Sequence, residues 1–390
     1  MTKFDFLENR AFDDRYSAFA PQGRQSLPGG DRWNPNYIDT GVKIHDNGDV
    51  DFGFYAPNAK QVKLVFGIRA HEPVLMEKDD IGVWKTTVKY DPTFCGPKAF
   101  HFDVDGAPVL SAYCPHYYSH GTSINYVEIP DANAPFVLMN DVPHGSVTYE
   151  FFWSDSLETW HRCLVYTPPA YEKGGEYPVM YLQHGGGENE TSWVYNGKAA
   201  HIMDNLIAEG KATPMLIVMC DGMVRGRGEQ RMSSQSFADT LLKNCIPFIE
   251  GKYRVKADKW NRALAGFSMG SMQSSIIGLT NPDKFAYLGL LSGFMRRLGP
   301  QANTGNILES NPHLALLADK EKFTSEIKLF YRGIGSNDFG FKTFCDDDEF
   351  CKENGYDAYP NIVRKVVEGY PHDWSVLRIL LHDFAQRIFK

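Results

Sequence analysis

Hydrophobic and polar positions alternate with a period of two over the first third of the chain. Val50, Phe52 and Phe54 alternate with acidic residues or glycine, and similar short runs recur between turn signals. Successive side chains of a strand point to opposite faces, so this period is typical of half-buried strands in a β-sandwich. Residues 1–32 are instead polar and interrupted by Pro and Gly, which predicts an irregular arm. We therefore expect an immunoglobulin-like β-sandwich over residues 33–140.

Longer apolar segments alternate with helix-like segments in the rest of the chain. The apolar runs predict strands at 178–185, 214–222, 262–267, 286–293, 327–335 and 361–369. Helical spacing predicts helices at 198–209, 237–252, 268–279, 341–355 and 374–389. Buried strands separated by helices are typical of a doubly wound, parallel α/β sheet. We expect this domain to span residues 145–390, with a further all-β piece up to about residue 168.

A tight turn joins one of these strands to the helix that follows it. The turn is Gly266-Phe-Ser-Met-Gly270. In this pattern the central residue has a strained backbone and the positions two residues away must be small, which suits Ser268 as a nucleophile. The helix start also offers N–H groups to a developing oxyanion, and the N–H of Met269 is the first of them. A chance match in a glycine-rich chain is the alternative, and the flanking strand and helix argue against it.

A glycine-rich loop follows an earlier predicted strand. It reads His184-Gly-Gly-Gly187, the pattern with which lipases and esterases build the other half of an oxyanion hole. We therefore expect the N–H of Gly186 or Gly187 to meet the oxyanion together with the N–H of Met269. His184 is expected to orient this loop rather than to act as a base.

The acid and the base are expected to follow the serine in the order acid, then histidine. His372 lies between the last predicted strand and the last helix, whereas His382 lies within that helix and His313 precedes any suitable acid. Asp338 ends a predicted strand, at the sheet edge where the sites of open α/β proteins gather. The acidic run at 346–349 lies in the next helix and is interpreted as a solvated face. His372 and Asp338 complete a predicted Ser-His-Asp triad.

Charge and cysteine content narrow the classes of partner. The chain has 40 basic and 48 acidic residues, a net charge of −8, which argues against nucleic acid and anionic membranes. No apolar run approaches the roughly 20 residues of a membrane helix. The seven cysteines are irregularly spaced and form no C-x-x-C, which favours free thiols over zinc. With no phosphate-binding glycine loop and no His-x-x-x-His spacing, we expect neither a cofactor nor a metal.

The first ten residues carry acidic side chains and lack an apolar core, so they do not form a signal peptide. For the sequence as it stands we expect a cytoplasmic location; a protein trimmed of its leader would be secreted or periplasmic. The expected partner is a small-molecule or oligosaccharide ester, and a homodimer is left open.

Four motifs in this order carry a family resemblance. They lie at 184–193, 266–270, 335–338 and 372–374. Together they resemble the esterase D type α/β-hydrolases, and most of all carbohydrate esterase family 1, the feruloyl and acetyl xylan esterases. The resemblance covers residues 145–390. The segments 52–57, 82–84 and 102–106 are similar to the early-set sandwich of family 48 carbohydrate-binding modules.

This resemblance implies an α/β-hydrolase domain preceded by the sandwich, and a serine esterase that cleaves feruloyl esters of xylan or xylo-oligosaccharides. An acetyl xylan esterase is the alternative. Glu188 and Asn189 follow the oxyanion loop within the matching stretch and are expected to contact substrate. Trp193 either forms an apolar wall for an aromatic acyl group or packs the loop onto the domain.

Two further functions stay open at this point. Enterochelin esterases also resemble a β-sandwich followed by a hydrolase domain, and activity on a siderophore lactone would favour that function. A glycan-binding protein with an inert hydrolase domain is the more distant alternative, and a covalent label on Ser268 would exclude it.

The sandwich itself offers weak evidence for sugar binding. Trp84 lies in a strand-like run, where a core position is the simpler interpretation. Tyr113, His116, Tyr117 and Tyr118 lie in a segment interrupted by proline, which we expect to be a loop. We therefore expect the sandwich to shape the pocket or a dimer rather than to capture polysaccharide.

Overall fold

The structure of the protein is a computed structural model that describes residues 24–27, 36–67, 72–119, 121–226, 228, 232–296 and 307–390. It divides into two compact units, Met1–Pro135 and Phe136–Lys390, a few residues before the boundary expected from the sequence. Among the described residues, none of the helices combines the length and the apolar character that crossing a membrane requires.

The first unit contains two antiparallel sheets that face each other. One has the order β11-β12-β9-β5-β6 with β10 beside β9, and the other β3-β4-β8-β7. Their strands are β3 (Gly41–Ile44), β4 (Val50–Tyr55), β5 (Val62–Phe66), β6 (Val74–Leu75), β7 (Glu77–Lys78), β8 (Val83–Val88), β9 (Gly96–Val104), β10 (Ala107–Val109), β11 (His116–Ser119) and β12 (Thr122–Ile129). Phe52 from one sheet contacts Phe66 and Phe100 from the other edge to face, which confirms a β-sandwich core.

Two predictions for this part of the chain need correction, and one is confirmed. Within the expected irregular arm, β1 (Arg24–Leu27) pairs with β2 (Asn36–Asp39); residues 1–23 and 28–32 of the arm lie outside the described residues. The expected loop around Tyr117 is strand β11, because it pairs with β12. Trp84 is buried as predicted, and its Nε1–H donates to the Ala56 carbonyl over 2.9 Å.

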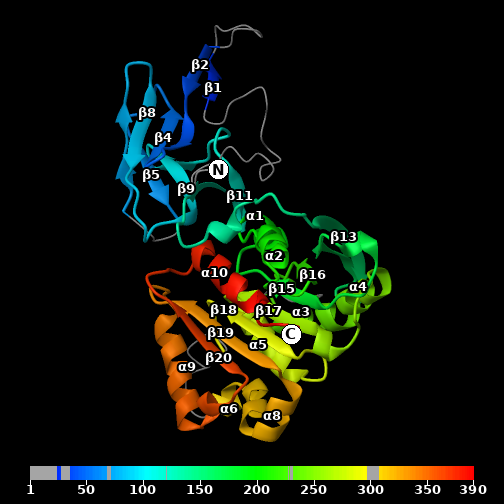
Figure 1. The fold of residues 1–390 in the computed structure, drawn as a ribbon. Coiled ribbons are helices and arrows are strands. Elements are labelled where there is room, and N and C mark those ends of the chain that lie inside the picture. Colours follow the sequence, from blue (N-terminus) through cyan, green and yellow to red (C-terminus); the bar gives the residue numbers. More distant parts are fainter. Residues whose placement is uncertain are drawn as a thin grey trace. The chain divides into compact units, whose positions relative to one another are not determined.

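The second unit is built on one sheet of eight strands with the order β13-β14-β16-β15-β17-β18-β19-β20 (Figure 1). The strands are β13 (Ser146–Ser154), β14 (Thr159–Thr167), β15 (Val179–Gln183), β16 (Leu216–Cys220), β17 (Arg262–Phe267), β18 (Tyr287–Leu291), β19 (Leu329–Gly335) and β20 (Ile362–Val367). The last six strands are parallel, and β13 and β14 form an antiparallel hairpin at one edge. The all-β piece expected before residue 168 is therefore part of this sheet.

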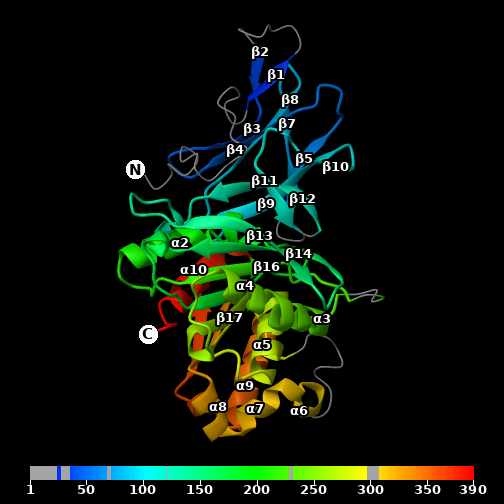
Figure 2. The ribbon, with the colours of Figure 1, turned by 90° about the vertical axis from the view of Figure 1, so that its right-hand side faces the viewer.

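Helices cover both faces of the sheet, which confirms the doubly wound α/β prediction (Figure 2). The helices α1 (Ser192–Tyr195), α2 (Ala199–Ala208) and α10 (Trp374–Ala385) form one layer, in which α2 packs against α10. The other layer includes α3 (Ser234–Asp239), α4 (Ile246–Lys252) and α5 (Met269–Thr280). Further helices are α6 (Ile307–Ser310), α7 (Ala315–Ala318), α8 (Lys320–Glu326) and α9 (Phe341–Glu353). The predicted helix 237–252 is interrupted by a π-helical segment, η5 (Thr240–Cys245).

The parallel strands end at a common edge, and a polar residue follows each of them. Asp221 follows β16, His184 follows β15, and Ser268 follows β17. Ser292, Asp338 and His372 come after β18, β19 and β20 in the same way. Because the carboxyl ends of parallel strands meet at one edge, the topology gathers these side chains from distant parts of the sequence.

Candidate active site

The turn after β17 holds Ser268 in a strained conformation. Its φ is +51° and its ψ is −107°, a region that residues with a Cβ rarely adopt. The turn closes tightly because a Cβ on Gly266 would lie 2.4 Å from the carbonyl carbon of Gly270. A Cβ on Gly270 would lie 2.6 Å from the carbonyl oxygen of His184. Both glycines are therefore required by contact, and the turn presents Ser268 at the start of α5.

The glycine-rich loop at 184–187, which we call the oxyanion loop, lies directly against this turn. A Cβ on Gly186 would lie 3.9 Å from the Met269 Cβ, so the exposed Gly186 faces the first residue of α5. Gly187 has a φ of +78°, a left-handed value that glycine adopts at little cost. The start of α5 and this loop are therefore neighbours, and an oxyanion hole formed by their N–H groups remains a prediction.

His184 orients the loop as expected from its place in the sequence. It is buried, its Nδ1 lies 2.8 Å from the Gly185 carbonyl oxygen, and its Nε2 accepts from the Gly222 N–H over 2.9 Å. The same Nε2 lies 3.3 Å from Asp221 Oδ1, so His184 ties the end of β15 to the residues that follow β16. Burial lowers the pKa of His184, but the Asp221 carboxylate and the Gly185 carbonyl outweigh this effect and raise it above its ordinary value.

Asp338 and His372 form a hydrogen-bonded pair at this edge. The Nδ1–H of His372 donates to Asp338 Oδ2 over 2.6 Å, and the carboxylate is buried. This bond leaves the Nε2 of His372 free to accept a proton. The Asp338 Oδ1 accepts from the Gly340 N–H over 2.7 Å, which fixes the carboxylate.

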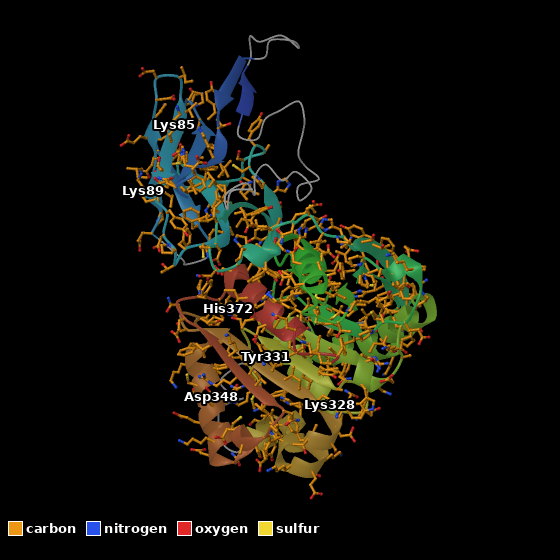
Figure 3. The ribbon with its side chains drawn as sticks, viewed as in Figure 1. Lys85, Lys89, Lys328, Tyr331, Asp348 and His372 are labelled. Carbon is orange, nitrogen blue, oxygen red and sulfur yellow. The ribbon has the colours of Figure 1, made fainter. Side chains whose placement is uncertain are left out.

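Aromatic rings surround His372 and bring it next to the serine turn. The ring of Phe267, the residue before Ser268, packs on the imidazole with centroids 4.8 Å apart. On another side, Phe339 contacts the imidazole at 4.3 Å and is 75% exposed. Figure 3 shows His372 near the start of α10, with Tyr331 on β19 below it.

Ser292 is a site residue that the sequence argument missed. Its hydroxyl donates to Asp338 Oδ2 and lies 3.3 Å from His372 Nδ1. Like Ser268, it follows a strand directly and has a positive φ, +48°. The available signal was its position, because the Leu291-Ser292-Gly293 sequence ends an apolar strand between those of the serine and the acid.

Glu188, expected to contact substrate, and Trp193, for which a substrate wall was one of two interpretations, both lie in the interior. Trp193 is 1% exposed, donates from Nε1 to the Gln183 carbonyl over 2.8 Å, and packs edge to face on Trp374. It therefore packs the loop onto the domain, the second of the two interpretations left open. Glu188 Oε2 accepts from the Gly185 N–H over 2.9 Å and Oε1 from the Trp374 Nε1–H over 2.9 Å. Burial raises the pKa of Glu188 to about 7.

Asn189 is half-buried, and its Oδ1 accepts from the N–H of Thr191 over 3.0 Å and from its hydroxyl over 2.6 Å. These bonds shape the turn that leads into α1. Its role as a substrate contact remains a prediction.

One member of the acidic run in α9, Asp347, departs from the solvated face expected from the sequence. Asp347 is fully buried, pairs with Arg296 and accepts from the Met295 N–H over 3.2 Å. The Arg332 Nη2 lies 3.9 Å from Asp347 Oδ2, so two guanidinium groups face this carboxylate. Asp346, by contrast, pairs with Lys342 at the surface. Asp347 is therefore a structural ion-pair residue, not a spare acid.

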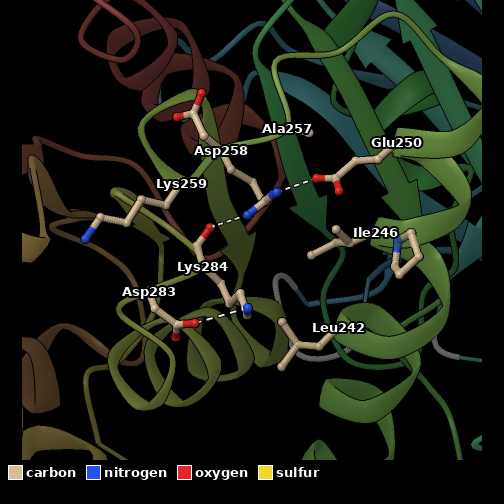
Figure 4. A pocket seen from close by; sticks show the side chains of 10 residues that line it. Leu242, Ile246, Glu250, Ala257, Asp258, Lys259, Asp283 and Lys284 are labelled. Carbon is tan, nitrogen blue, oxygen red and sulfur yellow. Dashed lines mark hydrogen bonds and ion pairs between the residues drawn. The ribbon is translucent and has the colours of Figure 1, made fainter.

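Two other features of this unit lie away from the strand-end cluster. A surface pocket of about 350 Å³ opens at the start of β17, the end opposite Ser268 (Figure 4). Arg262 in this pocket forms an ion pair with Glu250 and donates to the Lys284 carbonyl, so its guanidinium group is already paired. Elsewhere in the core, the thiols of Cys163, Cys220 and Cys245 lie within 4.8 Å of one another, and all seven cysteines are free.

The strand order, the strained serine and the histidine–aspartate pair are those of an α/β-hydrolase. Residues 154–325 match the sequence profile of the family described as "Putative esterase". The second unit thus has the α/β-hydrolase fold, and part of it is similar to this esterase family.

Known proteins similar to this chain include a xylanase/feruloyl esterase and a ferulic acid esterase. The chain is 37% identical over 358 residues to an endo-1,4-beta-xylanase/feruloyl esterase of Xylanibacter ruminicola. This match covers 89% of this chain and 46% of that protein. The chain thus spans less than half the length of this relative. It is also similar to the structure of a ferulic acid esterase of Anaeromyces mucronatus in complex with ferulic acid (TM-score 0.54, 24% identity, 65% of this chain and 93% of that chain).

A second similar structure is the enterobactin esterase of Shigella flexneri. Its TM-score is 0.64 at 13% identity, and the match covers 94% of this chain and 96% of that chain. At such identities the two solved structures establish a shared fold.

Proposed function

We propose that the protein is a serine carboxylic ester hydrolase that cleaves feruloyl esters of xylan or xylo-oligosaccharides. The observation that carries the ester-hydrolase part is the 2.6 Å bond between His372 and Asp338 beside the strained Ser268 turn. The feruloyl part is supported by the 37% identical relative whose name includes that activity.

The proposed reaction follows from the position of each group. The Ser268 hydroxyl attacks the ester carbonyl while His372 Nε2 takes its proton. Asp338 holds the imidazole by Nδ1 and stabilises its charged form. The N–H groups of Met269 and of Gly186 or Gly187 stabilise the oxyanion. His372 then protonates the leaving sugar alcohol, and a water molecule activated by the same histidine releases the acid from Ser268.

The exposed ring of Phe339 supports an aromatic acyl group over an acetyl group. A phenylalanine that is 75% exposed keeps most of its apolar surface in water, and it lies against the proposed base. A planar hydroxycinnamoyl group would cover this ring by stacking, whereas an acetyl group is too small to do so.

Kinetics of three variants on methyl ferulate test this proposal. Ser268→Ala should abolish turnover, and Asp338→Asn should lower kcat by roughly 10⁴-fold because the imidazole loses its orienting acceptor. Asp346→Asn, on the surface of α9, is the matched control and should keep the wild-type rate. Substantial activity in Ser268→Ala, or equal losses in the two aspartate variants, would contradict the assignment.

A siderophore esterase is the second candidate, and the likeness to the enterobactin esterase over 94% of this chain favours it. A panel of methyl ferulate, acetylated xylan and a catecholate siderophore lactone separates the candidates. Turnover of the lactone without turnover of methyl ferulate would replace the feruloyl proposal and leave the triad in place.

A further inference from the structure

Four large aromatic side chains are exposed on the edge hairpin of the hydrolase sheet. Tyr149, Phe151 and Trp153 on β13 are 47%, 57% and 47% exposed, and Trp160 on β14 is 67% exposed. We name these four residues the hairpin row. Soluble domains rarely leave so much contiguous apolar surface in water unless it binds something.

The hairpin row occupies a single face because of strand geometry. Its β13 members are two residues apart, so they point to the same side, and Trp153 lies directly opposite Trp160 in the antiparallel register. The residues between them face the other way: Glu150 accepts from Lys252 and Tyr253, and Phe152 stacks on Phe248. The inner face of the hairpin thus packs into the core, which holds the hairpin rigid and leaves its outer face exposed.

The hairpin row begins at the sheet edge that carries the candidate catalytic residues. Because β14 runs antiparallel to β16, the start of β14 lies at the carboxyl end of β16. There His161 Nε2 lies 3.0 Å from the Asp221 carbonyl oxygen. One residue further on, Arg162 pairs with Glu190 of the segment that follows the oxyanion loop. This ion pair links β14, the strand that carries Trp160, to the segment that follows the oxyanion loop.

The polar groups of the row are held in place as well. Arg162 lies opposite Phe151 in the register and its guanidinium lies 5.7 Å from the Tyr149 ring centroid. Trp153 and Trp160 meet edge to face, with centroids 5.9 Å apart and planes at 80°. This pair presents one ring face beside one ring edge. The Arg162 guanidinium and the Tyr149 hydroxyl are the hydrogen-bonding groups beside the row.

We propose that the hairpin row binds the sugar backbone of the polysaccharide whose ester Ser268 cleaves; this inference rests on the proposed function. Pyranose rings have apolar C–H faces that stack on aromatic rings and hydroxyl rims that take hydrogen bonds, which matches a row of rings bordered by Arg162 and the Tyr149 hydroxyl. Aromatic residues and arginine are also enriched where proteins associate, so a second copy of the chain is the alternative occupant that the binding measurement below tests. The position of the hairpin row, which starts at the sheet edge that carries Ser268, favours the substrate.

The spacing of the strands sets the length of substrate that can contact both Ser268 and the hairpin row. Two strands, β16 and β15, separate β14 from β17 in the sheet. Three strand spacings amount to about 14 Å, roughly the length of three linked pyranose rings. The hairpin row should therefore contact sugars about three or more units away from the esterified one, and short substrates should not reach it.

Kinetics with substrates of different length test this proposal on the full chain. Trp153→Ala combined with Trp160→Ala should lower kcat/KM on feruloylated arabinoxylan about tenfold or more, through KM, because two stacking surfaces are lost. The same variant should keep the wild-type kcat/KM on methyl ferulate. Trp260→Ala is the matched control, since Trp260 is 42% exposed but lies just before β17, at the end opposite Ser268. Equal kcat/KM on the polymer in variant and wild type, or equal losses on both substrates, would overturn the proposal.

A binding measurement separates this proposal from the esterase assignment. In the inactive Ser268→Ala background, retention on insoluble xylan should be strong for the parent and for Trp260→Ala, and weak for the double tryptophan variant. Retention by all three proteins, or by none, would overturn the hairpin-row proposal even if methyl ferulate is hydrolysed. If the wild-type protein does not hydrolyse methyl ferulate, that result would instead contradict the proposed function. A dimer that becomes monomeric when the two tryptophans are removed, with xylan retention unchanged, would identify the row as an interface between copies.

Discussion

The buried carboxyl of Glu188 should make the stability of the hydrolase unit depend on pH. Burial raises the pKa of this group from its ordinary value of 4.5 to about 7 in the folded protein. Between these two values the folded state holds a proton that the unfolded state has lost. The stability contributed by the protonated group is therefore complete below pH 4.5 and is lost as the pH rises through 7.

The size of this contribution follows from the shift. About 2.5 pKa units at 1.36 kcal/mol each give about 3 kcal/mol of unfolding free energy lost between pH 4 and pH 8. Glu188→Gln removes the titrating group, and its amide also places a donor where Glu188 accepts from the Gly185 N–H or from the Trp374 Nε1–H. The variant should thus have a lower unfolding free energy than the wild type at every pH, and the difference should be largest at low pH.

Urea unfolding at pH 5, 6, 7 and 8 measures this difference. The gap in unfolding free energy between wild type and Glu188→Gln should shrink by roughly 2 kcal/mol or more from pH 5 to pH 8. Glu172→Gln, an exposed glutamate, is the control and should track the wild type at every pH. A gap that stays constant across this range would refute the claim that Glu188 is held protonated by burial.

Three further substitutions test other parts of the site. Ser292→Ala removes a hydroxyl donor to Asp338, so we expect kcat on methyl ferulate to fall about tenfold with little change in KM; a KM effect alone would contradict a positioning role. Phe339→Ala should raise KM for methyl ferulate several-fold and leave acetylated xylo-oligosaccharides unaffected, and equal effects on both would exclude acyl stacking. Asp347→Asn should lower the unfolding free energy by about 3 to 5 kcal/mol because Arg296 loses its buried partner, as measured by chemical denaturation; a change below 1 kcal/mol would contradict this.

Those parts of the site that depend on neighbouring residues in the sequence could be predicted from it. The turn around Ser268 is an example, because its two glycines and the flanking strand and helix are local features. The places of Asp338 and His372 could be inferred as well, since a residue that ends a parallel strand must lie at the common edge.

Features that depend on packing between distant segments could not be predicted in this way. Glu188 and Trp193 lie next to the oxyanion loop in sequence, yet Trp374 from the last helix covers both of them. Asp347 belongs to an acidic run, but the two arginines that face it come from elsewhere in the chain. The aromatic alternation of β13 predicts a strand, but which of its faces is exposed depends on the packing of the other face against α4.

The central claim is that Ser268 forms a covalent acyl-enzyme with a feruloyl ester. The most direct measurement is the intact mass of the protein after rapid acid quenching during turnover of methyl ferulate, followed by peptide mapping. The account predicts added mass equal to one feruloyl group on the peptide that contains Ser268, and none in Ser268→Ala. A feruloyl adduct on another residue, or full turnover by Ser268→Ala without any adduct, would contradict it.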